Sequence, residues 1–369
     1  MERSAGGWVI GRVAGTRIVL RPGVLIVVAV VVAMLGPTIR RVRPDLGWLA
    51  FVVAAGFAVV LLISVLLHEL AHAGVARRFG LDVHEISLTL IGGHTELART
   101  TAPGSTALIA LVGPLTNAAI ALVAWGALAA VPPGGIADLL LLVTASANGF
   151  VAVINLLPGL PLDGGRLLEA LVWRVAGRCR TGTFVAALAG RVIAVAAVLA
   201  VVVVPYLGGA RPDLVTVVWG ALLGALLWSG AGPFLRAAAH ERAVDDVVLW
   251  RLAVPAPALP ASASVADLDA IRSATAVLVD DDGAPTGYVE PVAAAGVPPE
   301  HRPTTPLAAV SVRLSPGVGI DGGLTGPAAV RAVAEGARLS PVLVVLDRSG
   351  AVQGLLRYAD VVTALRRGS

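Results

Sequence analysis

Six apolar runs divide the first two thirds of the chain, and each is long enough to cross the hydrocarbon core of a bilayer. Inside a bilayer the backbone must satisfy its own hydrogen bonds, so uninterrupted runs of this kind fold as helices. We therefore expect six transmembrane helices, with short loops between them. The predicted spans are residues 18–35, 48–75, 106–131, 136–157, 184–204 and 214–235.

The composition supports a membrane protein and excludes other classes. Hydrophobic residues make up 57% of the 369 residues, charged residues 14%, and the mean hydropathy is +0.85. The formal net charge is +4, but the arginines gather at the ends of apolar runs and form no basic stripe, so no nucleic-acid partner is expected. The single cysteine, Cys179, excludes an intramolecular disulfide and a cysteine-based metal cluster.

The positions of the arginines predict how the chain is oriented. Arginines before the first span and in the loops at residues 77–99, 166–180 and 236–242 all fall on one side of the membrane. The opposite side carries the cluster at residues 40–43, which is the local exception, and Arg211. By the positive-inside rule we expect a multi-pass protein of the cell membrane with both termini in the cytoplasm.

The second apolar run ends in two histidines that flank a glutamate, in the order His68, Glu69, Leu70, Ala71, His72. On a helix, residues four apart share a face, so His68 and His72 point the same way and Glu69 lies beside them. This spacing is typical of a zinc pair with an adjacent general base. An ionisable residue within a span costs on the order of 3 kcal/mol, which favours a metal site over the alternative, a polar cluster that bonds helix to helix.

A candidate third ligand follows the fourth span. The segment from Asn155 to Gly165 is broken by Pro158, Gly159 and Pro161 and carries an acid, Asp163. Unwound backbone at membrane depth is tolerated only where it is buried in protein or lines a cavity. Asp163 could therefore reach the metal from this segment, and the alternative is a plain turn in which Asp163 caps the next helix.

Together, the His68 to His72 motif and the segment from Asn155 to Gly165 resemble the site-2 protease family of intramembrane zinc metalloproteases, over about residues 48–174. The resemblance implies Zn²⁺ as cofactor, with His68, His72 and Asp163 as its ligands. It also implies Glu69 as catalytic base, and Asn155 as a catalytic residue that binds substrate or stabilises the oxyanion. Gly92 and Gly93 resemble the glycine pair of the family's membrane-edge loop, before which residues 83–90 alternate like a strand or short hairpin.

The C-terminal part repeats itself. After a proline-rich linker near residues 255–260, residues 277–289 match residues 344–356 at one constant offset, each reading as strand, Asp-to-Gly turn and strand. The two copies resemble a tandem of cystathionine-β-synthase (CBS) domains. The expected fold is thus a polytopic α-helical membrane protease domain with a small membrane-edge β segment, residues 1–240, and a cytoplasmic α/β tandem CBS-like regulatory domain, residues 241–369.

The CBS resemblance leaves two roles open for this domain. In nucleotide-binding copies a hydroxyl residue follows the second strand, and an aspartate three residues later holds ribose. Here Asp360 is in place, but Arg357 stands at the hydroxyl position, and the first copy has Glu290 and Ala293. Homodimerisation or substrate gating is therefore the preferred role, and adenine nucleotide binding is the alternative.

The expected function is cleavage of single-span membrane proteins within or near the transmembrane segment, in regulated intramembrane proteolysis of, for example, a membrane-bound transcription regulator or anti-sigma factor. The partners are then that substrate and membrane lipid, and the strand at residues 83–90 could hold the substrate extended by edge pairing. The alternatives are a catalytically silent member that binds membrane proteins, and a metal transporter. Convergence of the polar residues at one depth favours the protease.

Overall fold

The computed structural model describes residues 3–4, 6–13, 15–89, 92–97 and 102–368. The chain divides into two compact units, Met1–Leu235 and Arg236–Ser369. The division falls within a long helix, α7 (Leu214–Asp245). The domain boundary predicted between residues 240 and 241 lies in the same helix and stays a prediction.

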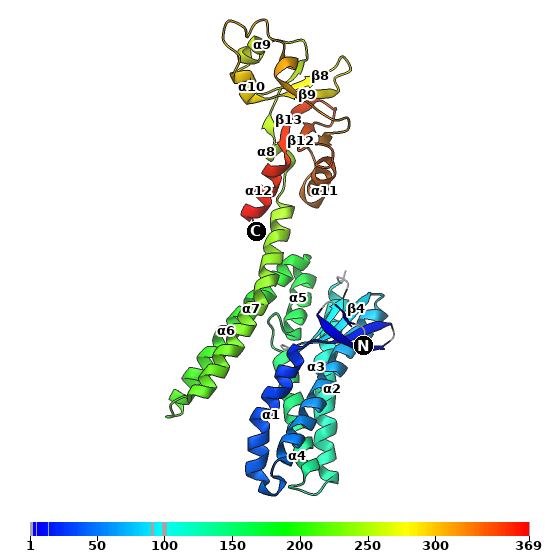
Figure 1. Cartoon of the computed structure of the whole chain (residues 1–369), viewed down its shortest axis with the longest axis vertical. Coiled ribbons are helices and arrows are strands. Elements are labelled where there is room, and N and C mark those ends of the chain that lie inside the picture. The colour runs from blue at the N-terminus through cyan, green and yellow to red at the C-terminus, as the bar shows by residue number, and fades with distance from the viewer. Residues whose placement is uncertain (1–2, 5, 14, 90–91, 98–101, 369) are drawn as a thin grey trace. The chain divides into compact units, whose positions relative to one another are not determined.

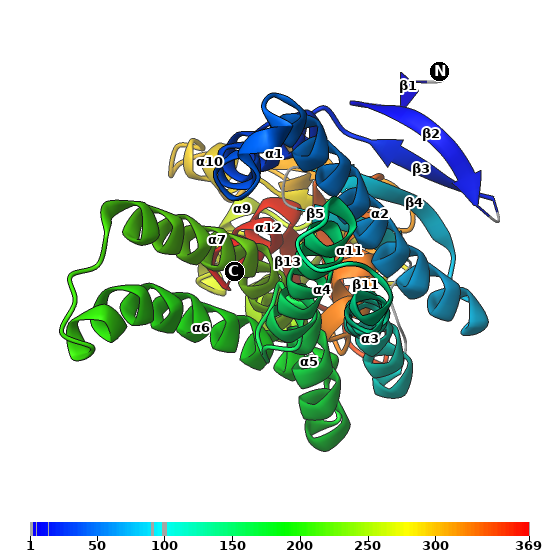
Figure 2. The ribbon, with the colours of Figure 1, turned by 90° about the horizontal axis from the view of Figure 1, so that it is seen from below.

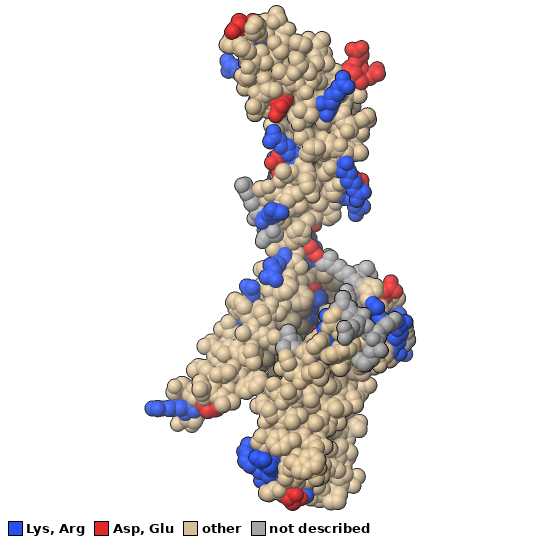
Figure 3. Space-filling view, in the orientation of Figure 1, with Lys and Arg blue, Asp and Glu red and all other residues tan. Residues whose placement is uncertain are grey.

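The first unit contains the predicted membrane-crossing helices (Figure 1). Six helices in the described part are long and apolar enough to cross a membrane, so the chain is a multi-pass α-helical membrane protein, as predicted. Their outer surface carries few charges in the face shown in Figure 3, and Leu122 and Val123 are each 73% exposed, as lipid-facing side chains are. The helices are α1 (Gly23–Val42), α2 (Leu49–Arg78), α3 (Pro103–Ala127), α4 (Ile136–Asn155), α6 (Cys179–Leu207) and α7.

Short 3₁₀ turns extend the loops between these helices, namely η1 (Pro44–Leu46) and η2 (Leu128–Ala130). Within the bundle α3 occupies the central position, since it packs against α2, α4 and the shorter helix α5 (Asp163–Ala176). Side chains on α3 can therefore contact residues from three other helices.

The predicted membrane-edge strand is confirmed, but it belongs to a larger sheet than the sequence indicated. Residues 83–89 form β4, which makes a hairpin with β5 (Gly92–Leu97), while residue 90 lies outside the described residues. The five strands run in the order β1-β2-β3-β4-β5, and Figure 2 shows the N-terminal strands beside β4. The N-terminal strands are β1 (Arg3–Ser4), β2 (Gly7–Val13) and β3 (Thr16–Leu20).

The start predicted for the first span, at residue 18, was wrong. Ile18, Val19 and Leu20 lie in β3 and pair in parallel with Ile86 to Leu88 of β4, and the helix begins only at Gly23, after Pro22. Ile18 and Val19 are 5% and 1% exposed. A buried strand is as continuously apolar as a membrane helix, so hydropathy alone does not separate the two.

The irregular segment before α5 is held against α6. Leu160 is fully buried, and its backbone N–H donates to the carbonyl of Ala186 at 2.9 Å. Small residues allow this approach, because a Cβ at Gly190 would overlap the carbonyl of Leu160. They recur at every fourth position of α6, at Gly182, Ala186, Gly190 and Ala194, all buried. This packing fixes the backbone that leads to Asp163.

The second unit contains two α/β copies, which confirms the predicted repeat. The same turn closes both hairpins: Asp280 Oδ1 accepts the N–H of Ala284 at 2.8 Å, and Asp347 Oδ1 accepts that of Ala351 at 2.9 Å. The first copy has the sheet order β10-β9-β8-β7 and the second β11-β12-β13-β6. The strands are β6 (Val254–Pro255), β7 (Ala258–Pro260), β8 (Val277–Val279), β9 (Pro285–Val289), β10 (Ser311–Arg313), β11 (Gly319–Asp321), β12 (Val342–Leu346) and β13 (Val352–Arg357).

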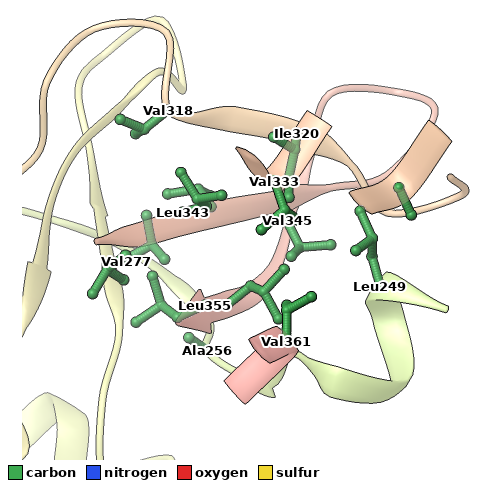
Figure 4. Packing of buried hydrophobic residues seen from close by; sticks show 14 of the residues in the cluster. Leu249, Ala256, Val277, Val318, Ile320, Val333, Leu343, Val345, Leu355 and Val361 are labelled. Carbon is green, nitrogen blue, oxygen red and sulfur yellow. The ribbon is translucent and has the colours of Figure 1, made fainter. Parts of the chain in front are cut away.

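Apolar side chains from both faces of the second sheet make one apolar core of this unit (Figure 4), and the first copy contains another. Leu343, Val345, Leu355 and Val361 are among its buried members, with Leu249 packed on them. Helices complete the two copies: α8 (Leu249–Leu252), α9 (Val265–Ala270), α10 (Pro291–Ala295), η3 (Leu307–Val310), α11 (Gly326–Gly336) and α12 (Tyr358–Gly368).

The proline-rich linker predicted near residues 255–260 was wrong. Pro255 lies in β6 and Pro260 in β7, and each of these strands is at the edge of its sheet. Proline lacks a backbone N–H, and an edge strand leaves one row of backbone groups unpaired. The prolines therefore fit the strands without costing ladder hydrogen bonds.

Candidate metal centre

The structure brings His68, His72 and Asp163 together from two helices. The two histidines lie one turn apart on the same face of α2, with their Nε2 atoms 3.0 Å from each other. Asp163 opens α5, and its Oδ2 lies 3.1 Å from Nε2 of His68 and 3.5 Å from Nε2 of His72. Both histidines are 7% exposed and Asp163 is half-buried. One potential ligand atom from each residue thus faces a common point.

Hydrogen bonds behind the two rings define their tautomers. Nδ1 of His68 lies 2.5 Å from Oδ1 of Asn117, and Nδ1 of His72 lies 2.6 Å from the carbonyl oxygen of Ile109. Because both partners are acceptors, each Nδ1 carries the proton and each Nε2 keeps its lone pair.

These lone pairs leave the centre with a surplus of acceptors. Oδ2 of Asp163 is inaccessible to solvent and has no hydrogen-bond partner among the described residues. With both rings neutral, two imidazole nitrogens and a carboxylate oxygen face one another, an arrangement that repels unless a cation lies at the centre. Two histidines and one carboxylate are a common set for a catalytic zinc, with the fourth position left open. The three side chains fit a metal of this kind.

Gly113 of α3 closes the site on one side. A Cβ at this position would overlap Nε2 of His72 and come within 2.6 Å of Nε2 of His68. Ile109 lies four residues before Gly113 and Asn117 four residues after it, so all three share one face of α3. This face supplies the hydrogen-bond acceptors for both imidazole rings and, at Gly113, the space that the rings occupy. The helix α3 thus positions both histidines through Ile109, Gly113 and Asn117.

Glu69 is held by the edge strand of the sheet. It is 7% exposed, and its Oε2 accepts a hydrogen bond from Oγ1 of Thr95 at 2.5 Å. Gly93 lies against the same side chain, because a Cβ there would overlap it. Gly93 and Thr95 are two residues apart in β5, so they share one face of the strand. That face fixes the carboxylate beside the two histidines.

Among the described residues no hydrogen bond joins the Asn155 side chain to this cluster. Asn155 is the last residue of α4, half-buried, and its side chain makes no hydrogen bond among the described residues. Its catalytic role stays a prediction.

Sequence reasoning missed several residues of the centre. Asn117 was not singled out as a residue of the site, although a carboxamide inside a span already signals a specific role. Thr95 and the carbonyl of Ile109 gave no signal, because nothing local in their sequence distinguishes them.

Comparisons with known proteins find a peptidase family and zinc metalloproteases. The profile of Peptidase family M50 matches residues 56–139 and 133–201. The putative zinc metalloprotease Rip3 of Mycobacterium tuberculosis is 33% identical over 230 residues, which are 60% of this chain and 57% of that protein. The putative zinc metalloprotease sll0528 of Synechocystis is 26% identical over 260 residues, 69% of this chain and 67% of that protein. The chain thus spans a little over half the length of Rip3.

Solved structures are similar to each unit. A site-2 protease from Methanocaldococcus jannaschii superposes with a TM-score of 0.44 and 24% identity, covering 62% of this chain and 95% of that chain. The CBS domain of a bacterial CNNM/CorC family Mg²⁺ transporter gives a TM-score of 0.26 and 13% identity, covering 35% of this chain and 83% of that chain.

Proposed function

Since the membrane-spanning part of this chain belongs to the site-2 protease family, Peptidase family M50, we propose that the protein is an intramembrane zinc endopeptidase. The observation that carries the proposal is the convergence of one ligand atom each from His68, His72 and Asp163, all within 4.8 Å of one another. These three residues would hold Zn²⁺. When bound, the ion supplies a Lewis acid that polarises a carbonyl and acidifies water.

The remaining chemistry belongs to Glu69. With Oε2 held by Thr95, Oε1 is the oxygen that accepts the proton of the attacking water and then passes it to the leaving amine. Burial of Glu69 keeps competing bulk water from its carboxylate. Asn155, at the end of α4, is proposed to bind the substrate backbone, as the family resemblance implies.

The substrate is proposed to pair with β5. The earlier expectation that residues 83–90 offer a free edge was wrong, because β4 is hydrogen-bonded to β3 on one side and to β5 on the other. In the described part of the sheet β5 pairs only with β4, so its outer edge is available. A substrate helix must unwind before its carbonyls are reachable, and edge pairing would hold it extended beside Glu69.

A synthetic transmembrane peptide tests this pairing. Every second N–H of an added strand faces its neighbour. N-methylation of single residues around the cut site should therefore inhibit cleavage at alternate positions. Equal cleavage of all the N-methylated peptides would contradict pairing with β5.

The wider role is proposed from the same resemblance. Both termini would be cytoplasmic, as the arginines predict, and the substrates would be single-span membrane proteins cut in regulated intramembrane proteolysis. The C-terminal unit would dimerise or gate substrate, with an adenine nucleotide as the alternative ligand. Titration of the purified chain with ATP and AMP, together with its oligomeric state in detergent, distinguishes these two roles.

Cleavage of a panel of tagged single-span proteins by the detergent-purified chain tests the proposed activity. Mass spectrometry should place the cuts within or near the transmembrane segments, and Asp163→Ala should lose both zinc and cleavage. A folded chain that binds zinc but cuts no member of the panel would instead favour the silent binding protein. Zinc carried across vesicle membranes by the intact chain would favour the transporter.

A further inference from the structure

A chain of buried carboxamides runs from His68 through three helices. Oδ1 of Asn117, in α3, faces Nδ1 of His68, and Nδ2 of Asn117 donates to Oδ1 of Asn148, in α4, at 2.8 Å. Nδ2 of Asn148 in turn donates to the backbone carbonyl of Thr144 at 3.0 Å. Asn117 and Asn148 are 2% and 1% exposed, so water does not compete for these bonds.

The last member of the chain determines the direction of all the others. A backbone carbonyl can only accept, so Asn148 must turn its NH₂ group to Thr144 and its oxygen to Asn117. Asn117 must then turn its own NH₂ group to Asn148 and its oxygen to His68. Each amide orientation is thus dictated by its neighbour, and Nδ1 of His68 is obliged to carry the proton.

A reversed Asn117 amide would favour the other tautomer of His68. If Asn117 were reversed, its NH₂ group would face Nδ1 of His68 and favour the tautomer with the proton on Nε2. That proton would point at Oδ2 of Asp163, 3.1 Å away, and close a hydrogen bond across the metal position. The centre would then be satisfied without a metal.

We propose that Asn117 and Asn148 are positioning residues that lock His68 in its metal-binding tautomer. Asn148 acts through Asn117, since within the described part of the chain its side chain hydrogen-bonds to Asn117 and to the carbonyl of Thr144. The inference rests on the proposed metal site and deepens it. Outer partners of ligating histidines typically change metal affinity by roughly 10- to 100-fold when they are replaced.

The test compares three variants of the full chain. Asn148→Leu removes the acceptor that orients Asn117, and should weaken zinc binding roughly 10- to 100-fold. Adding Asn117→Asp to that variant supplies an acceptor that needs no orientation, and should restore most of the affinity. Ser146→Ala, at an exposed residue of the same helix that is not part of this chain of carboxamides, should bind zinc like the wild type. Affinity is measured by competition with a chromogenic chelator, alongside the thermal unfolding midpoint.

A second readout separates this inference from the proposed function. In the metal-free protein with ¹⁵N-labelled histidine, the wild type should show His68 protonated at Nδ1, and Asn148→Leu should show protonation at Nε2. This signature needs neither zinc nor proteolysis. A folded Asn148→Leu chain with unchanged tautomer and unchanged zinc affinity would overturn the inference, and so would a double variant that stays as weak as Asn148→Leu alone. If wild type and variants share the Nδ1 tautomer and none binds zinc, the proposed metal site fails as well.

Discussion

The hydroxyl of Thr95 in β5 donates a hydrogen bond to Oε2 of Glu69 in α2, at 2.5 Å. The two residues lie 26 positions apart, and the contact joins the edge strand of the sheet to the helix that carries both histidines. Gly93, on the same face of the strand, leaves room only for the Glu69 side chain. The strand proposed to bind substrate thus also positions the proposed base.

Replacing Thr95 by valine should slow cleavage without loss of zinc. Valine keeps the shape but removes the hydroxyl, and a hydrogen bond to a charged group contributes about 1.5–3 kcal/mol, so a roughly 10- to 100-fold fall in kcat is expected. Steady-state cleavage and zinc content are measured on the same preparations. Thr95→Ser, which retains the hydroxyl, is the control. A valine variant as fast as the serine variant would show that this hydrogen bond does not position the base.

Replacing Gly113 by alanine should abolish metal binding. The new methyl group would occupy the space next to Nε2 of both histidines and push the rings apart. Gly126→Ala is the matched control, because it lies on the same helix with nothing within 4 Å of the added carbon. Zinc per chain is counted after purification of both variants. Full zinc occupancy in Gly113→Ala would place the metal elsewhere.

The C-terminal unit should lose local stability in acid through one ion pair. Arg302 binds both oxygens of Asp269 at 2.6 and 2.7 Å, and this pairing holds the pKa of the Asp269 carboxyl below its ordinary value. A carboxyl whose pKa is lower in the folded state stabilises the fold at pH values above its unfolded pKa, about 3.9. This contribution is lost as the pH falls through its folded pKa. The Asp269 side chain is 50% exposed, so the effect is small.

Hydrogen exchange of residues 264–271 in the full chain, corrected for the intrinsic rate, measures the effect. Protection should fall between pH 6 and pH 3 in the wild type, and fall less in Arg302→Gln. Arg338→Gln, an exposed arginine without a recorded ion pair among the described residues, should behave like the wild type. Equal slopes in all three chains would contradict the assignment to Asp269.

Local periodicity predicted the parts of the centre that lie on one helix. His68 and His72 follow from a spacing of four on an apolar helix, and Asp163 from a proline-broken segment together with the family resemblance. Asn117 and Thr95 could not be assigned to their partners, because those contacts depend on how α3 and β5 pack on α2.

The fold was predictable to a similar extent. Helix lengths follow from the thickness of the bilayer, so the spans at α2, α3 and α4 were predicted within a few residues. Ile18 to Leu20 form a strand because β4 lies beside them. Pro255 and Pro260 lie in edge strands because β6 pairs with β13 and β7 pairs with β8, each on one side. In each case a distant segment decided the local structure.

Glu69→Gln tests whether Glu69 is the base of a zinc-dependent cleavage. Glutamine keeps the size of the side chain and can still accept from Thr95, but it cannot take a proton from water. Zinc content and cleavage of a transmembrane substrate are measured together on the purified chain. We expect one zinc per chain, as in the wild type, with cleavage reduced roughly 10²- to 10⁴-fold or more. Cleavage at the wild-type rate by the zinc-loaded Glu69→Gln chain would contradict this role of Glu69.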